Sequence, residues 1–231
     1  GLNLLGLSGQ FDYETSTGLS ANQVLFDVLG GSTQASIRSE LFGNGGATSI
    51  ELDGEVDMRP VNDWLDLTIL RLTEGSTTYQ GSLSVAYGGR EDQPVFEFAS
   101  DLQGITIDMP PPIGKSIKDA SRALHVTQSF EANGSELAFE LDHSAGGILR
   151  LVGDEVQGGI IEIGDYEPKA VAFDSIRITG ELPYASLEEW DGFLLKLDDL
   201  SKGDVAEAFR ARLDSVKVQA ATFDLFGYTL N

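Results

Sequence analysis

The two histidines are the side chains best suited to general acid–base catalysis, and neither has the neighbours that this chemistry needs. His125 lies in a run of alternating apolar and polar residues, and His143 stands between Asp142 and Ser144. These three residue types form a catalytic relay only where their side chains meet. Adjacent residues of a strand point to opposite faces, so this triplet cannot form a relay within itself. We expect both histidines to be structural or exposed, and we predict no catalytic residue.

Four carboxylates alternate along one short run, at Glu51, Asp53, Glu55 and Asp57. They would share one face of a strand, and carboxylate oxygens are ligands that Ca²⁺ accepts. The run lacks the central glycine and the closing glutamate of an EF-hand loop, so a solvated acidic face is favoured and no metal site is predicted. A pair of catalytic carboxylates in a glycan-active enzyme stays open as an alternative, although no spacing singles out a pair.

Composition excludes several classes of function. The chain has 231 residues with 15 Lys and Arg against 37 Asp and Glu, a net charge of −22. Nucleic acid is therefore excluded as a partner, because its affinity depends on basic side chains that neutralise phosphates. There is no cysteine, which excludes a disulfide scaffold, a zinc–thiolate site and a cysteine nucleophile. No phosphate-binding loop or His-Glu-x-x-His motif is present, so we predict no cofactor.

Short runs of alternating apolar and polar residues fill most of the sequence, and most are bounded by Gly, Asn, Asp or Pro. This period of two is typical of antiparallel strands with one apolar and one polar face. Asn133 and Gly134 predict the central positions of a hairpin turn. We expect the apolar members of these runs to line one concave side of the sheet: Leu83, Val85, Phe96, Phe98, Ile105, Ile107, Leu137, Phe139, Leu149, Leu151, Ile161 and Ile163.

Three segments have helical spacing instead. The first follows Pro60 and carries Trp64, with Gly75 as its stop, and the second follows Ser186 as N-cap and carries Trp190. A third is predicted over residues 204–213.

A strand-to-helix unit occurs twice. Residues 49–56 resemble residues 175–182, and in both copies a tryptophan follows the glycine by ten residues. We therefore expect Trp64 and Trp190 to be buried where each helix packs on the sheet. The repetition indicates one continuous segment over residues 1–231, with units of about 1–75 and 76–200 and a further unit that starts near 214–231. Because the sequence starts at Gly1 and stops within an apolar pattern, we expect a longer parent protein.

Two or three short helices are too few to cover the apolar face of so many strands. One solution is a sheet folded on itself as a sandwich with a dry core. The other is an open groove whose apolar face is covered by a ligand.

A resemblance to a known family favours the groove. Residues 100–115, SDLQGITIDMPPPIGK, resemble the stretch SDLQG-x-x-x-x-LP-x-PLGK of YhdP-like proteins, in the AsmA/TamB family of bacterial envelope proteins. Weaker likenesses flank it at residues 18–31, 75–83 and 180–190. Met109 and Pro111 depart from the pattern without removing any chemistry.

The resemblance implies a mainly β fold: a long twisted antiparallel sheet curled into an open groove, with two or three short amphipathic helices. It implies a periplasmic segment of an inner-membrane-anchored protein that carries phospholipid towards the outer membrane. The expected partners are phospholipid acyl chains, neighbouring segments of the same longer chain, and membranes through parts outside this sequence. The alternative is a structural or adhesive β-repeat or sandwich with a dry core and no lipid cargo.

Overall fold

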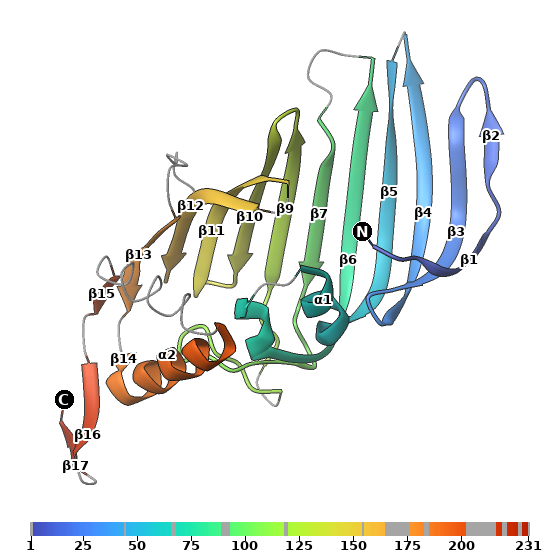
Figure 1. Cartoon of the computed structure of the whole chain (residues 1–231). Helices are drawn as coiled ribbons and strands as arrows, with labels where there is room; N and C mark the ends of the chain where they lie inside the picture. Colours follow the sequence, from blue (N-terminus) through green and yellow to red (C-terminus); the bar gives the residue numbers. More distant parts are fainter. Residues whose placement is uncertain are drawn as a thin grey trace.

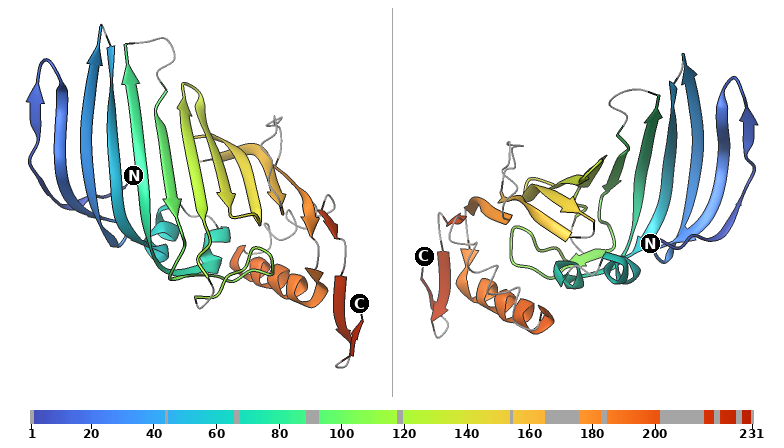
Figure 2. Two further views of the ribbon diagram at one scale, coloured as in Figure 1. Left: turned by 180° about the vertical axis from the view of Figure 1, so that it is seen from behind. Right: turned by 45° about the horizontal axis from the view of Figure 1, so that its top comes forward.

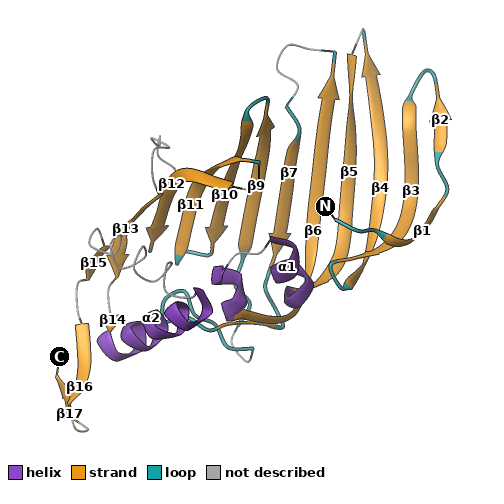
Figure 3. Cartoon of the chain, in the orientation of Figure 1, coloured by secondary structure: helices purple, strands orange, loops and turns teal. Residues whose placement is uncertain are grey.

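The computed structural model describes residues 2–43, 45–65, 68–88, 93–117, 120–153, 155–164, 176–182, 185–201, 216–218, 221–225 and 228–230. Most of these residues lie in strands (Figures 1 and 3). The strands of the main sheet are β1 (Leu5–Gly9), β2 (Asp12–Glu14), β3 (Gly18–Val28), β4 (Gly31–Phe42), β5 (Gly45–Asp57), β6 (Thr73–Tyr87), β7 (Val95–Ser100), β8 (Ile105–Ile107), β9 (Leu124–Glu131), β10 (Gly134–Leu141), β11 (Ala145–Val152), β12 (Glu155–Ile163), β13 (Ile176–Leu182) and β15 (Val216–Val218).

These 14 strands form one open sheet in the order β1-β3-β4-β5-β6-β7-β9-β10-β11-β12-β13-β15, with β2 paired to β3 and β8 paired to β6. Neighbours are antiparallel up to β12, whereas β12–β13 and β13–β15 are parallel. The sheet is curled, so β9–β13 do not lie in the plane of β3–β6 (Figure 2). The predicted mainly β, open and curled sheet is therefore confirmed.

A second, small sheet consists of β14 (Ala185–Ser186), β16 (Ala221–Leu225) and β17 (Tyr228–Leu230). It lies at the C-terminal end of the molecule and does not face the main sheet (Figure 1). Within the described ranges no second sheet therefore covers β3–β12, so the fold is not a sandwich. The division into repeat units stays a prediction.

The helices are α1 (Met58–Leu65), the 3₁₀ helix η1 (Thr68–Leu72) and α2 (Leu187–Ser201). Ser186 caps α2 as predicted, since its Oγ accepts a hydrogen bond from the backbone N–H of Glu189 at 3.3 Å. The helix predicted over 204–213 lies outside the described residues.

The sequence predicted that Gly75 ends a helix, but Gly75 lies inside β6 instead. It has a φ of 110° and pairs with Ile105 of β8. A Cβ at this position would lie 2.1 Å from the carbonyl oxygen of Gly104. Glycine is needed here because the backbone of β6 closely approaches the backbone next to β8. Strand β6 therefore begins directly after η1.

The prediction that both tryptophans are buried is wrong for Trp64, which is 45% exposed at the end of α1. Trp190 packs against Ile163 and Ile178 of the sheet and makes an edge-to-face contact with Phe193, with 5.7 Å between ring centroids. The two helices therefore differ in how they meet the sheet, although their sequences share the same spacing. The spacing of apolar residues determines which face of a helix is apolar, but it does not determine what that face packs against.

Candidate functional site

Cross-strand register brings the apolar residues of successive strands onto one face, because directly paired residues lie on the same side of a sheet. Two rows run across the strands, and we call them the apolar stripe. The upper row lies nearer to the end of β6 at Tyr87 and contains Ile37, Ile50, Leu83, Phe96, Gln128, Leu137 and Leu149. The lower row contains Ala35, Leu52, Gly81, Phe98, Val126, Phe139, Gly147, Ile161 and Ile178.

The register gathers on this face all the predicted lining residues except Ile105 and Ile107. Val85 and Leu151 lie in the row above the stripe, two residues along their strands from Leu83 and Leu149. Ile163 lies in the row below it, opposite Ala145. That these side chains line a lipid groove stays a prediction.

Ile105 and Ile107 lie in β8, opposite Gly75 and Thr73 of β6. Both are buried in a cluster with Leu102 and Leu141. They belong to the packed core at one end of the sheet, at the margin of the apolar face.

Aromatic rings cover glycines within the stripe. Phe98 pairs with Gly81 and stacks on Tyr79, with 5.3 Å between centroids and 20° between ring planes. Phe139 pairs with Gly147, where a Cβ would lie 2.8 Å from the ring. These rings fill the space that glycine leaves in the lower row. The upper row is apolar except at Gln128.

The opposite face is polar, which confirms the prediction for three of the four members of the acidic run. The fourth, Asp57, is half-buried and accepts a hydrogen bond from the backbone N–H of Arg59 at 2.8 Å. Glu51, Asp53 and Glu55 are exposed, and Asp53 accepts a hydrogen bond from Gln80 at 3.3 Å. His125 is exposed on the same face. Among the described residues no group of three or more His, Asp or Glu side chains could hold a metal ion.

Carboxylates also border a surface hollow of about 690 Å³ beside this polar face. Asp27, Asp53 and Glu55 line it together with Gln34, Thr78 and residues of β1 and β3–β5. A second hollow of about 300 Å³ on the polar face is lined by Glu51, Glu97 and His125, so these two hollows are the candidate positions for a glycan-active site. His143, in the turn after β10, is exposed and lines neither hollow.

In the part of the chain that the structure describes, helices and loops pack against the apolar face along one rim only, a rim formed by the ends of the strands. We call this rim of strand ends, which is not an edge strand, the covered edge. Strands β5, β7, β10 and β12 end there, and α1, η1, α2 and residues 102–115 pack together (Figures 1 and 3). Three clusters fill it, around Ile105 with Leu141, around Ile163 with Ile178, and around Leu72 with Phe193.

Strands β4, β6, β9 and β11 end at the opposite rim, and no described helix lies there (Figure 1). We call this the open edge. Among the described residues, the apolar face is thus packed along one margin and uncovered along the other.

Residues 100–115 build part of the covered edge, which explains the motif structurally. Ser100 Oγ accepts a hydrogen bond from the backbone N–H of Leu102 at 3.0 Å, and Asp101 accepts one from Gln103 at 3.0 Å. Leu102 has a φ of 51°, and the backbone N–H of Ile105 donates to its carbonyl oxygen at 3.2 Å. The polar residues therefore hold a tight turn that brings Leu102 and Ile105 into the core.

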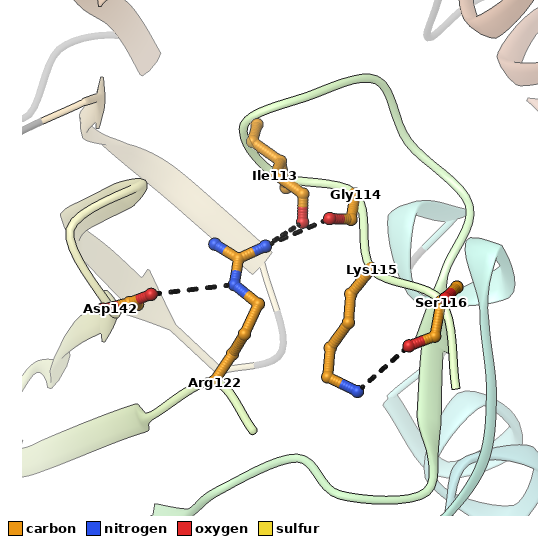
Figure 4. Close-up of polar contacts among 6 residues, drawn as sticks. All are labelled: Ile113, Gly114, Lys115, Ser116, Arg122 and Asp142. Carbon is orange, nitrogen blue, oxygen red and sulfur yellow. Dashed lines mark hydrogen bonds and ion pairs between the residues drawn. The ribbon is translucent and has the colours of Figure 1, made fainter. Parts of the chain in front are cut away.

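Two cations complete this structure (Figure 4). Lys115 is 4% exposed, and its Nζ donates to the carbonyl oxygens of Ile105 at 3.0 Å and Ser116 at 3.4 Å. Arg122 donates to the carbonyl oxygens of Ile113 at 2.6 Å and Gly114 at 3.2 Å, and its Nε lies 3.9 Å from Asp142. The sequence showed Lys115 only as part of a motif and showed no role for Arg122, because their partners are main-chain carbonyls that any residue supplies.

Comparison with known proteins identifies a family. The family model described as YhdP protein matches residues 1–231, the whole sequence. Comparison with curated proteins and with solved structures gave no match. Within the described residues, no helix is both long enough and apolar enough to cross a membrane.

Proposed function

We propose, because the chain belongs to the YhdP family, that it is a segment of a bridge-like lipid transport protein of the bacterial envelope. In this proposal its apolar face shields the acyl chains of phospholipids that move between the inner and outer membranes. The observation that carries the proposal is the apolar stripe, which runs from β4 to β13 and which the described residues cover along one edge only.

The length of the stripe suits a conduit. Neighbouring strands lie about 4.8 Å apart, so the nine strands from β4 to β13 extend about 40 Å along the curled sheet. Each buried methylene contributes about 0.8 kcal/mol without directional contacts. A lipid that slides along the stripe keeps this term nearly constant, so the barriers to its movement are low.

The proposal needs no catalytic residue and no cofactor, since only non-covalent contacts change. It places the segment in the periplasm, within a longer protein that is anchored in the inner membrane. Neighbouring segments of that protein would continue the stripe, and the net charge of −22 would limit adhesion to anionic membrane surfaces.

Site-specific photo-crosslinking in cells tests the proposal. A photo-crosslinking amino acid is placed in the full-length protein at Phe98 or Phe139 and, as matched controls, at Glu97 or Glu140. Adjacent residues of one strand point to opposite faces, so each pair compares the two faces at one position along the sheet.

Phospholipid adducts confined to Phe98 and Phe139 are expected. Equal labelling of both faces, or no labelling of either, would contradict the conduit and favour a structural or adhesive β-repeat.

A further inference from the structure

We infer that the strand ends of the open edge form an interaction surface for a partner protein, and that the partner contributes a cationic amphipathic α-helix that lies across these strands. The inference goes beyond the proposed function and does not depend on it. It follows from the spacing and the charge of exposed side chains at the strand ends.

Large apolar side chains stand exposed at successive strand ends of the open edge. Tyr13, Leu41, Tyr87 and Phe130 are the last or the last but one residues of β2, β4, β6 and β9 (Figure 1). They are between 39% and 72% exposed, and none belongs to a buried cluster of the described residues. We call these four the rim residues. Contiguous exposed apolar side chains of this kind mark interaction sites on proteins.

Two of the rim residues lie in one cross-strand row. Leu41 and Tyr87 both align with Gly46, from opposite sides of β5. A Cβ at Gly46 would lie 2.5 Å from the Tyr87 hydroxyl oxygen, so the tyrosine side chain extends over β5 towards Leu41. The gap between β4 and β6 is therefore bridged by an aromatic ring.

The other two rim residues lie on the same face of the sheet. Phe130 is two residues along β9 from Gln128, which belongs to the upper row of the stripe. Tyr13 pairs with Leu19, two residues along β3 from Ala21, and Ala21 pairs with Ile37 of that row. All four rim residues therefore present their side chains to a partner that approaches from one side.

The spacing of the rim residues indicates a helix. Successive rim residues lie on strands that have one other strand between them, so they are about 9.6 Å apart. An α-helix advances about 10.5 Å in seven residues, and apolar residues repeated at this interval would meet one rim residue each. An extended strand repeats the same face every ~6.7 Å and would lose alignment after one step.

The charge beside the rim residues indicates a cationic partner. Asp12 and Glu14 flank Tyr13, Glu40 precedes Leu41 and Glu131 follows Phe130, and all four carboxylates are exposed. Among the described residues only the carboxylate of Glu131 has an ion-pair partner, the guanidinium of Arg150. Lysine or arginine beside the apolar face of a helix would complement this alternation of apolar and acidic side chains.

The same charges disfavour two other occupants of the open edge. A second copy of the chain would bring its own carboxylates to the rim, and each copy carries a net charge of −22. A surface of anionic lipids would be repelled for the same reason.

Binding of a model helix tests the inference on the full-length protein in phosphatidylcholine nanodiscs. The probe is a fluorescent peptide of about 20 residues, built from heptads with leucine at the first and fourth positions and lysine at the others. A second peptide has the same composition, but its leucines are scattered around the helix. Fluorescence anisotropy gives both affinities after subtraction of the signal with empty nanodiscs.

Two double variants locate the binding surface. Leu41→Ser with Phe130→Ser removes two rim residues, and the control, Leu25→Ser with Leu195→Ser, removes two leucines of similar exposure outside the rim. Limited proteolysis checks that both variants keep the fold. The rim variant should weaken binding of the heptad peptide at least tenfold, and the control should weaken it less than twofold. The scattered peptide should bind the wild-type protein at least tenfold more weakly than the heptad peptide.

Equal affinities of the two double variants, or of the two peptides, would overturn the inference, because net charge alone would then explain the binding. A photo-crosslinking residue at Tyr87 identifies the occupant directly, and an adduct with the heptad peptide is expected. A covalent dimer of the protein or a lipid adduct in place of the peptide adduct would overturn the inference in favour of a second copy or a membrane.

Discussion

The rings of Tyr79 and Phe98 stack at 5.3 Å across two strands, directly beside the position where Gly81 leaves the sheet without a side chain. The Tyr79 hydroxyl also forms a 2.9 Å hydrogen bond with the hydroxyl of Thr33. One aromatic pair thus connects β4, β6 and β7 and forms part of the apolar face. Stability and the proposed contact surface depend here on the same atoms.

Replacement of Phe98 by alanine should lower the free energy of unfolding by about 2 kcal/mol, because both the stack and the cover over Gly81 are lost. Phe98→Leu, which keeps most of the apolar area, should cost about half as much. Urea unfolding followed by circular dichroism measures both. Glu97→Ala on the opposite face is the control, and an equal loss for Glu97→Ala and Phe98→Ala would contradict the assignment of faces.

Gly147→Ala should destabilise the chain by about 1–3 kcal/mol, because the new Cβ would meet the Phe139 ring at 2.8 Å and the Ile160 carbonyl oxygen at 2.5 Å. Gly192→Ala in α2 is the matched control, since nothing lies within 4 Å of its Cβ position. That change should be neutral or stabilise the helix by up to about 1 kcal/mol. Thermal melts of both variants check the prediction, which fails if Gly147→Ala melts at the wild-type temperature.

Lys115→Met should cost about 2–3 kcal/mol, although methionine has nearly the same length, because the buried carbonyl oxygen of Ile105 loses its donor. The control is Lys196→Met, which removes an exposed lysine that pairs with Asp108. Exposed ion pairs contribute little, so this control should change stability by less than about 1 kcal/mol. Denaturant midpoints of the two variants should differ clearly, and equal midpoints would refute a structural role for the Lys115 ammonium.

The two tryptophans should respond differently to truncation. Trp190→Ala should cost about 3 kcal/mol, since the indole packs on Ile163, Ile178 and Phe193. Trp64→Ala should cost less than about 1 kcal/mol, because its indole is 45% exposed and packs in none of the buried clusters of the described residues. Chemical denaturation of both variants gives the comparison, and a larger loss at Trp64 would mean that this indole is packed in solution.

A charge on the apolar stripe should block function while the fold persists. Leu83→Glu places a carboxylate where the proposed lipid path needs hydrocarbon, and an unpaired charge there is costly to any acyl chain that passes. Ser84→Glu is the control on the polar, exposed side of the same strand. The full-length protein with Leu83→Glu should fail to complement a strain that lacks this protein. The full-length protein with Ser84→Glu should complement that strain. Wild-type complementation by Leu83→Glu would argue against passage along this face.

The sequence alone determined the strands and the polarity of their faces. Alternation with a period of two is a local property, and it places Leu83, Phe96, Phe98 and Leu137 on one face of any sheet in which their strands pair in register. The N-cap of α2 at Ser186 is equally local, because the capping side chain and the helix it caps are adjacent. The family motif was also visible, since it consists of contiguous residues.

Only the tertiary structure decided what those faces meet. Gly75 became part of β6 because β8, about 30 residues further along, pairs with it. The hairpin turn predicted at Asn133 and Gly134 is shifted by one residue, since Glu131 pairs with Gly134 and leaves Ala132 and Asn133 at the centre. Register in a sheet depends on both strands, and one strand cannot specify it.

The covered edge illustrates the same limit at the candidate site. It is assembled from α1, η1, α2 and residues 102–115, segments separated by up to about 140 positions. Trp64 and Trp190 have the same local spacing, yet only Trp190 lies against the sheet. Burial is a property of the surface that a side chain meets, and that surface comes from distant parts of the chain.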